Sequence, residues 1–184
     1  PGPIGVHEMA ERLIESGQFE GPVPRQHLSQ NVEHSPIHNA WQAKRDHLLP
    51  EDYPLHDVEV YSDYLMNKGP AYGQVGGVHD ILKASNGQTY VVERDDAVAA
   101  KTQFESIEGI DIMTPGAVAM ASLQQALASG EVDPDACTVL NISGGGVERL
   151  KQDNATETVE PWLRVTKADG AAMIIEALEQ VGGT

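Results

Sequence analysis

Residues 138–149 read TVLNISGGGVER, a short apolar run that ends in a hydroxyl and three glycines. Such a run predicts a buried strand over residues 138–142 that enters a tight loop. In parallel α/β sheets ligands bind beyond the carboxyl ends of the strands, so Ser143 is predicted to face a crevice. Glycines lack a Cβ and let flat or anionic groups approach the main chain. A glycine-rich connection without a ligand explains the pattern equally well.

Helical and strand patterns alternate along the rest of the chain. Apolar spacing predicts helices over residues 4–16, 35–42, 58–66, from 78 onward, 95–106, 116–129 and after Asp169. Further strands are predicted over residues 25–31, 89–92 and 160–166. This alternation favours an α/β fold with a mainly parallel sheet flanked by helices.

The composition restricts the class of partner. The 184 residues are 40% hydrophobic, and 12 Lys and Arg stand against 28 Asp and Glu, for a formal charge of -16. This balance disfavours nucleic acids and anionic membrane surfaces, but it allows an anionic small substrate where a few cations gather locally. No apolar run approaches the length of a membrane span.

Cysteine, histidine and the start of the chain add three expectations. Cys137, the only cysteine, precedes an apolar run and is predicted to be a buried, inert thiol, which fits a cytoplasmic protein. His34 and His38 are four residues apart, but Pro36 lies between them, so no metal site is predicted. The first five residues form no signal peptide, and we expect the chain to begin within a larger unit.

Several motifs together resemble one enzyme family. The segment EGID at residues 108–111, a helix of small residues, and LNISGGG at residues 140–146 are similar to the C-terminal part of threonine and cysteate synthases. The segment HLSQN at residues 27–31, followed by NAW at residues 39–41, resembles cysteate synthase more than threonine synthase. Both are pyridoxal-phosphate (PLP) enzymes of fold type II, the tryptophan-synthase-β type. The resemblance covers residues 1–155, and residues 156–184 are expected to form a C-terminal strand and helix.

The resemblance implies a set of cofactor-binding residues. Ser143 matches the hydroxyl that hydrogen-bonds the pyridine nitrogen of PLP, and Gly144 follows it. A neutral hydroxyl makes the ring a weaker electron sink, which suits elimination and replacement better than transamination. Glu108 and Gly109 match a segment near the cofactor ring. Gly2 matches a glycine of the phosphate loop, at the N-terminus of the first predicted helix.

The Schiff-base lysine of the family is not matched in this chain. It belongs in a Ser-x-Lys-Asp/Asn setting, and none of the lysines here has that setting. The resemblance therefore implies that no catalytic residue lies in this chain and that a lysine-bearing N-terminal portion or partner chain completes the enzyme. Pro1 and Pro3 also depart from the family's phosphate loop, and residues 113–115 depart from the Asp-Pro-Ala-type sequence common there.

Two functions remain open at this point. The first is a PLP-dependent synthase component, a transferase or lyase of amino-acid biosynthesis. It would convert O-phosphoserine and sulfite to cysteate, or O-phosphohomoserine to threonine. Arg25, Gln30 and Asn31 are then the candidate contacts to substrate, and a homo-oligomer is expected. The second is a non-catalytic module that binds an amino acid or anion and lacks the Schiff-base half. An unrelated nucleotide-binding domain is disfavoured, because no phosphate-loop motif is present.

Overall fold

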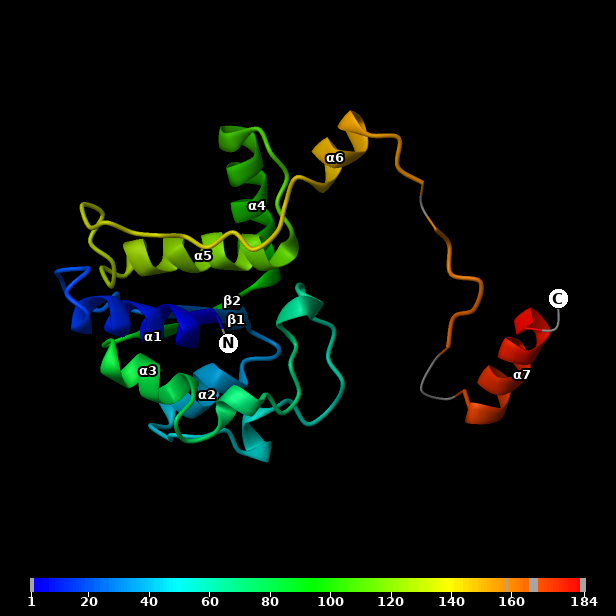
Figure 1. Cartoon of the computed structure of the whole chain (residues 1–184), viewed down its shortest axis with the longest axis horizontal. Coiled ribbons are helices and arrows are strands. Elements are labelled where there is room, and N and C mark those ends of the chain that lie inside the picture. Colours follow the sequence, from blue (N-terminus) through cyan, green and yellow to red (C-terminus); the bar gives the residue numbers. More distant parts are fainter. Residues whose placement is uncertain (1, 158, 166–168, 183–184) are drawn as a thin grey trace. The chain divides into compact units, whose positions relative to one another are not determined.

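The computed structural model describes residues 2–157, 159–165 and 169–182. Contacts divide the chain into two units, one up to Leu150 and one from Lys151 onward. The first unit is an α/β arrangement around a small parallel sheet (Figure 1). Across the described ranges, no helix combines the length and apolar character needed to span a membrane.

In chain order the elements are α1 (Gly2–Glu15), β1 (His27–Asn31), α2 (Pro36–Gln42), three 3-10 turns (Pro50–Asp52, Asp63–Leu65 and Ala71–Gly73), α3 (Val78–Ala84), β2 (Gln88–Val92), α4 (Arg94–Glu108), α5 (Thr114–Ala128), α6 (Val147–Asp153) and α7 (Ala171–Gly182).

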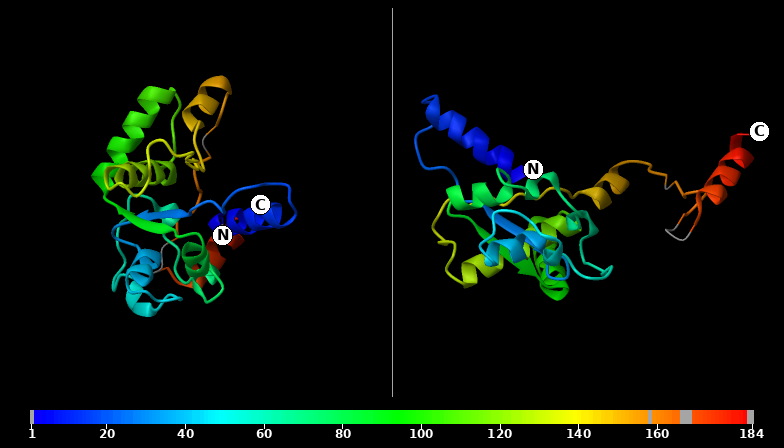
Figure 2. Two further views of the ribbon diagram at one scale, coloured as in Figure 1. Left: turned by 90° about the vertical axis from the view of Figure 1, so that its left-hand side faces the viewer. Right: turned by 90° about the horizontal axis from the view of Figure 1, so that it is seen from below.

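The sheet consists of β1 and β2, which pair in parallel. His27 lies opposite Gln88 and Asn31 lies opposite Val92, so the two strands end together at their carboxyl ends. The connection between them contains α2 and α3, as a parallel pair requires. Helix α5 packs on one face of the sheet, and α2 and α3 lie on the other (Figures 1 and 2).

Two apolar clusters hold these layers together. The larger one packs Val92 of β2 against buried alanines of α4 and α5, with Ile112 and Val118. The smaller one lies on the opposite face, where Val78, Ile81 and Leu82 of α3 contact Leu28 of β1. The periodic apolar residues of these predicted helices therefore form the core, as the sequence indicates.

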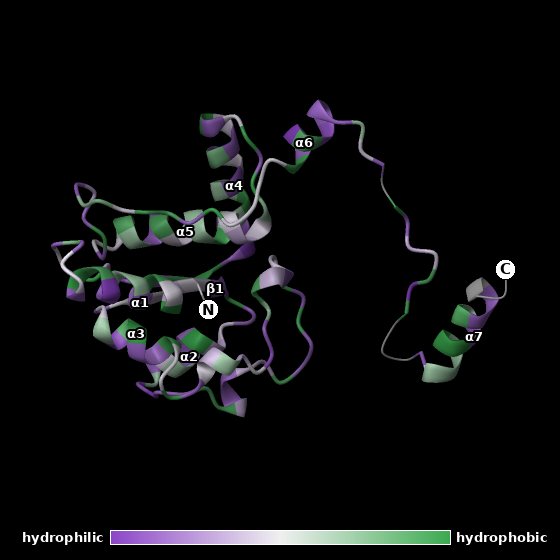
Figure 3. Ribbon diagram, in the orientation of Figure 1, coloured by the Kyte–Doolittle hydropathy of each residue, from purple (hydrophilic) through white to green (hydrophobic). Residues whose placement is uncertain are grey.

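The small residues of helix α5 let neighbouring segments pack close to its backbone. Its buried residues are almost all small: Gly116, Ala117, Val118, Ala121, Ser122 and Ala126. A Cβ at Gly116 would lie 3.3 Å from Cγ2 of Ile142, so the segment before the glycines runs against this helix. Figure 3 shows α5 coloured as hydrophobic along much of its length, which agrees with its place between α4 and the sheet.

The prediction of a helix over residues 58–66 is wrong. The structure has irregular backbone there, with only a short 3-10 turn at Asp63–Leu65. Its main chain is held by a side chain from β1, because Asn31 hydrogen-bonds both the N–H and the carbonyl of Ser62. These tertiary bonds replace the local bonds that a helix would make, and propensity is too weak to oppose them.

The strands predicted over residues 138–142 and 160–166 are also corrected. Residues 138–142 are extended but pair with no strand in the described part of the chain, and Val139 is 88% exposed. Residues 160–165 form no strand, and Thr166 lies outside the described residues. A strand needs a neighbour to take its backbone hydrogen bonds, and a sequence pattern does not reveal whether one exists. Cys137 is exposed rather than buried, since the segment around it lacks that cover.

The second unit contains the helix expected after Asp169. Helix α7 carries an apolar face on which Ile175 and Leu178 are both more than half exposed (Figure 3). The division after Leu150 falls before the boundary predicted at residue 155, and α6 spans it.

A buried carboxylate fixes the long connection between the strands. Arg45 donates two hydrogen bonds to the carboxylate of Asp52, and the Leu49 N–H donates a third to Oδ2 at 2.7 Å. Asn39 of α2 donates to the Asp52 carbonyl at 2.8 Å. Burial acts to raise the pKa of Asp52, but the hydrogen bonds from Arg45 and Leu49 outweigh it and lower this pKa below its ordinary value.

We therefore expect Asp52→Asn to lower the free energy of unfolding by about 2 kcal/mol at neutral pH, since it removes charge-assisted bonds from a buried site. A folded-state pKa below the unfolded one means that this stabilisation is present above the unfolded pKa of about 4 and disappears as the pH falls through the folded value. Urea denaturation of both proteins from neutral pH to pH about 3 measures the difference. Asp63→Asn, at an exposed position, is the control, and an equal loss in both variants would contradict the assignment.

Candidate functional site

Two segments far apart in the sequence meet beside α5. Ile112 and Gly145 form an isolated antiparallel bridge. The Met113 N–H donates to the Gly144 carbonyl at 3.0 Å, and the Gly146 N–H donates to the Asp111 carbonyl at 2.8 Å. We call this contact the glycine bridge. It brings together the EGID segment and the LNISGGG segment, the two parts of the chain from which most of the cofactor contacts are predicted.

The three glycines have a structural cause within the chain. A Cβ at Gly145 would lie 2.5 Å from the Asp111 carbonyl oxygen and 3.2 Å from the Cα of Ile112. A Cβ at Gly144 would lie 2.9 Å from Sδ of Met113, and Gly146 has a φ of +72°. Backbone packing at Gly145 and a left-handed turn at Gly146 therefore account for these two glycines without any ligand, and a methyl group at position 144 would have to displace the Met113 side chain.

Asp111 extends the glycine bridge into α6. Its carboxylate accepts hydrogen bonds from the backbone N–H groups of Val147 at 3.0 Å and Glu148 at 3.2 Å. Desolvation acts to raise the pKa of Asp111, but these N–H groups at the start of α6 together lower it below its ordinary value. The ionised carboxylate thus satisfies the first turn of the helix. Sequence reasoning missed this role, because nothing local to Asp111 indicates a helix that begins 36 residues later.

Ser143 immediately precedes the glycine bridge. Its side chain is exposed and makes no hydrogen bond to another described residue, so its hydroxyl is available to a ligand. Gly144, next to it, is occupied by its bond to Met113. Glu108 is exposed at the end of α4, and Gly109 ends that helix with a φ of +68° and an N–H bond to Glu105. The glycine at position 109 therefore has a helix-capping role.

Asn31 lies at the carboxyl end of β1 and connects the sheet to the start of α5. Its Nδ2 donates to the Ser62 carbonyl at 2.8 Å, and the Ser62 N–H donates to its Oδ1 at 3.0 Å. Thr114 donates to the Ser62 hydroxyl at 3.1 Å, one residue beyond the bond between Met113 and Gly144. The structure thus places Asn31 in one network with the glycine bridge, but its amide is fully buried and already paired.

Gln30 is engaged in the same way on the opposite face. Its Oε1 accepts the backbone N–H of His38 in the first turn of α2 at 3.0 Å. His38 in turn contacts the Thr89 hydroxyl through Nδ1 at 2.9 Å. Burial is the main reason that the pKa of His38 lies below its ordinary value. The N-cap residue of α2, Ser35, makes no side-chain hydrogen bond to the first turn, so Gln30 of β1 supplies that bond instead.

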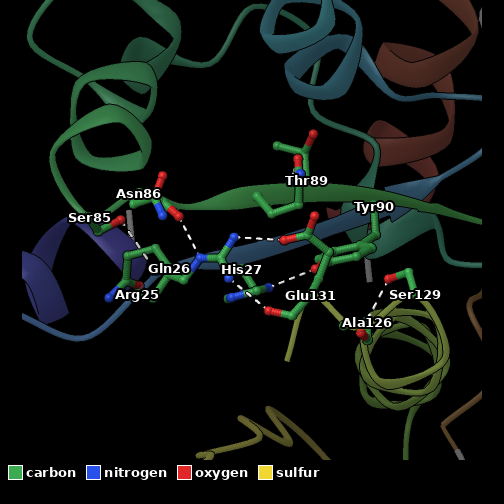
Figure 4. Close-up of polar contacts among 11 residues, drawn as sticks. Arg25, Gln26, His27, Ser85, Asn86, Thr89, Tyr90, Ala126, Ser129 and Glu131 are labelled. Atoms are coloured by element: carbon green, nitrogen blue, oxygen red, sulfur yellow. Dashed lines mark hydrogen bonds and ion pairs between the residues drawn. The ribbon is translucent and has the colours of Figure 1, made fainter. Parts of the chain in front are cut away.

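Arg25 lies away from Gln30 and Asn31, before the amino end of β1. Figure 4 shows its guanidinium between β2 and the residues after α5. Nε donates to the Asn86 carbonyl at 2.5 Å, and the other two nitrogens donate to the carbonyl and the Oε2 of Glu131, each at 2.7 Å. Beside it, His27 Nδ1 and the Tyr90 hydroxyl lie 2.8 Å apart. The three predicted substrate contacts therefore do not converge, and Arg25 joins the sheet to α5.

The remaining candidates stay apart from the glycine bridge. Gly2 is exposed at the start of α1, a helix that packs on α3. His34 and His38 face different partners, the Asn67 carbonyl and the Thr89 hydroxyl. Among the residues that the structure describes, no three His, Cys, Asp or Glu side chains are grouped so that they could hold a metal ion.

Gly145→Ala tests the glycine bridge directly. The added methyl would collide with the Asp111 carbonyl, so we expect the free energy of unfolding to fall by about 1–3 kcal/mol, the usual cost of overpacking. Amide resonances of residues 111–114 and 143–148 should shift together. Gly5→Ala, whose Cβ meets nothing within 4 Å, is the matched control and should not destabilise the protein. An effect at position 145 no larger than that of the control would refute the bridge.

Comparison with known proteins gives a consistent set of relatives. No family model matches the sequence. The chain is 43% identical over 164 residues to a protein named cysteate synthase from Methanosarcina barkeri, an alignment that covers 87% of this chain and 39% of the relative. Proteins of the same name from Methanocella arvoryzae and Methanoculleus marisnigri are 44% and 41% identical over 172 and 175 residues, which is 91% and 93% of this chain. The chain spans about two-fifths of the length of these relatives, and over most of its own length it is similar to cysteate synthases.

Proposed function

We propose that this chain is a component of a PLP-dependent synthase that acts on a phosphorylated amino acid, with O-phosphoserine and sulfite converted to cysteate. The observation that carries the proposal is the identity of about 40% over about 90% of the chain to proteins named cysteate synthase. That name favours cysteate over threonine as the product. The meeting of the EGID and LNISGGG segments in the glycine bridge supports the cofactor assignment, because the family resemblance places both near one ring.

The residues of this chain fit a role in holding the cofactor. Ser143 offers an exposed, unengaged hydroxyl that suits a hydrogen bond to the pyridine nitrogen, and the glycine bridge fixes the backbone beside it. Glu108 and Gly109 lead into the same bridge through Asp111. Gly2 would contribute its backbone N–H at the start of α1, a helix with no acidic residue in its first turn. When bound, PLP supplies the electron sink for elimination and replacement.

The chain's own contribution to this chemistry is electrostatic and positional. The neutral hydroxyl of Ser143 would hydrogen-bond the ring nitrogen without placing a carboxylate next to it. The nitrogen would then not be kept protonated, and the ring would be a weaker electron sink. The Asp111 carboxylate is held by N–H groups of α6 and does not compete for that nitrogen. Asn31, Ser62 and Thr114 hold the loop at the carboxyl end of the sheet next to the bridge.

The proton-transferring lysine is proposed to come from a further portion or a partner chain. Lys101 is engaged with Glu105 and with the Ile112 carbonyl, the latter at 2.8 Å, and so supports the bridge from α4. Lys68 pairs with Asp57. We further propose that the complete enzyme is a homo-oligomer in which residues 1–155 form part of the cofactor-binding fold.

Ser143→Asp is the variant that tests the assignment. With the lysine-bearing portion supplied, we expect the cofactor's absorption band to remain while turnover of O-phosphoserine with sulfite falls at least about tenfold, because a carboxylate would keep the ring nitrogen protonated. Absorption spectra and cysteate formation are measured on the same preparation.

Ser106→Asp, at an exposed position on α4, adds the same charge away from the glycine bridge and should leave turnover unchanged. Equal turnover in Ser143→Asp and wild type would remove Ser143 from its assigned role. Binding of amino acid without any PLP absorption, even with the lysine-bearing portion present, would replace the enzyme proposal with the non-catalytic module.

A further inference from the structure

Residues 138–142 form an extended segment whose main chain has no partner. In the part of the chain that the structure describes, no backbone N–H or carbonyl group of residues 137–143 takes part in a hydrogen bond. The segment runs along α5 (Figure 1), and Ile142 packs on the larger apolar cluster. An extended segment of this kind leaves a row of donors and acceptors with which another extended chain can pair.

The side chains of this segment alternate as they do in a strand with one covered face. Leu140 and Ile142 are half-buried, whereas Val139, Asn141 and Ser143 are exposed. Val139 is the most open of the apolar residues here, with 88% of its surface exposed. Successive side chains of a strand point to opposite faces, so this period of two is the expected pattern. Residues 138–142 therefore have the side-chain arrangement of a sheet strand and lack only a neighbouring strand.

The segment also lacks the features that protect a strand edge in water. Residues 136–147 contain no charged residue and no proline, although the whole chain carries a formal charge of -16. Natural proteins block exposed strand edges with charged side chains, proline or a bulge, because an unprotected edge pairs with other chains. The composition of residues 136–147 therefore indicates an edge that another extended chain covers.

The charge of the chain and the length of its relatives favour one occupant of this edge. Two copies of this chain would each bring a formal charge of -16, and their mutual repulsion opposes pairing of like with like. The alignment with the Methanosarcina barkeri relative covers 39% of that protein, so about three-fifths of it has no counterpart here. That remainder is long enough to contain a strand, and the edge leads directly into Ser143.

We propose that residues 138–142 are the docking strand for the lysine-bearing portion of the enzyme. An extended segment of that portion pairs with their main chain and covers Val139. The inference rests on the proposed function, from which it takes the existence of this portion, and it adds where the portion binds. Because Ser143 follows the paired residues directly, docking by strand pairing holds the portion next to the hydroxyl that is assigned to the cofactor.

Hydrogen exchange followed by mass spectrometry tests the proposal. The full chain is measured alone and in complex with the part of the Methanosarcina barkeri relative that lies outside the alignment, after the two are expressed together. Amides of residues 137–143 should exchange at least about a hundredfold more slowly in the complex than in the chain alone. Failure to form a complex, or a complex in which these amides stay unprotected, would overturn the proposal. Protection in the chain alone that accompanies the mass of a dimer would assign the edge to a second copy instead.

Two proline variants locate the paired edge. Thr138→Pro and Val139→Pro remove neighbouring N–H groups, which point to opposite edges of an extended segment, so one of them interrupts the pairing whichever edge is used. That variant should raise the dissociation constant of the complex at least about tenfold. Neither N–H has a partner within the described chain, so the free energy of unfolding of the chain alone should not change.

Val75→Pro is the matched control. Val75 is 69% exposed and is the second residue of a turn that the bond from the Gly77 N–H to the Gln74 carbonyl closes, a position that accepts proline. It should leave the dissociation constant unchanged. Equal dissociation constants for Thr138→Pro, Val139→Pro and Val75→Pro would refute strand pairing at residues 138–142.

The docking inference and the proposed function fail separately. Protection of residues 137–143 in a complex that shows no PLP absorption band would support the docking strand and contradict the proposed function. A complex that binds PLP and forms cysteate while residues 137–143 stay unprotected would leave the proposed function standing and overturn the docking strand.

Discussion

The approach of two backbones at Gly145 is the constraint on which the first unit depends. Asp111 and Ile112 lie so close to Gly145 that a methyl group does not fit between them. Because of this contact, the carboxylate of Asp111 reaches the start of α6, and Met113 can bind the Gly144 carbonyl where α5 begins. The position of Ser143 follows from these bonds, since it is the residue immediately before the bridge.

The parts of the fold that a sequence predicts are those whose causes are local. Apolar spacing in α3 and α5, and the β-branched run of β2, correspond to elements in the structure. The segment around Ser62 does not form a helix, because the Asn31 side chain, 31 residues earlier, hydrogen-bonds both the N–H and the carbonyl of Ser62. The run at residues 138–142 has the composition of a strand, yet it needs a neighbour that composition cannot supply.

The candidate site was likewise only partly predictable from the sequence. The family resemblance associates residues 108–111 with residues 140–146, and the structure brings these segments together. Arg25, Gln30 and Asn31 look like ligand contacts in the sequence, because they are polar residues in and just before a strand. Their partners, Glu131, His38 and Ser62, lie eight or more residues away, so the sequence alone did not indicate that these side chains are already paired.

We propose that this chain holds PLP together with a lysine that it does not itself provide. Intact-mass measurement before and after borohydride reduction, on the protein purified with everything that accompanies it, tests this most directly, because reduction fixes the cofactor to the lysine that binds it. We expect a polypeptide or portion other than residues 1–184 to gain the pyridoxyl mass. A preparation in which no polypeptide gains that mass, or in which a lysine of residues 1–184 does, would contradict it.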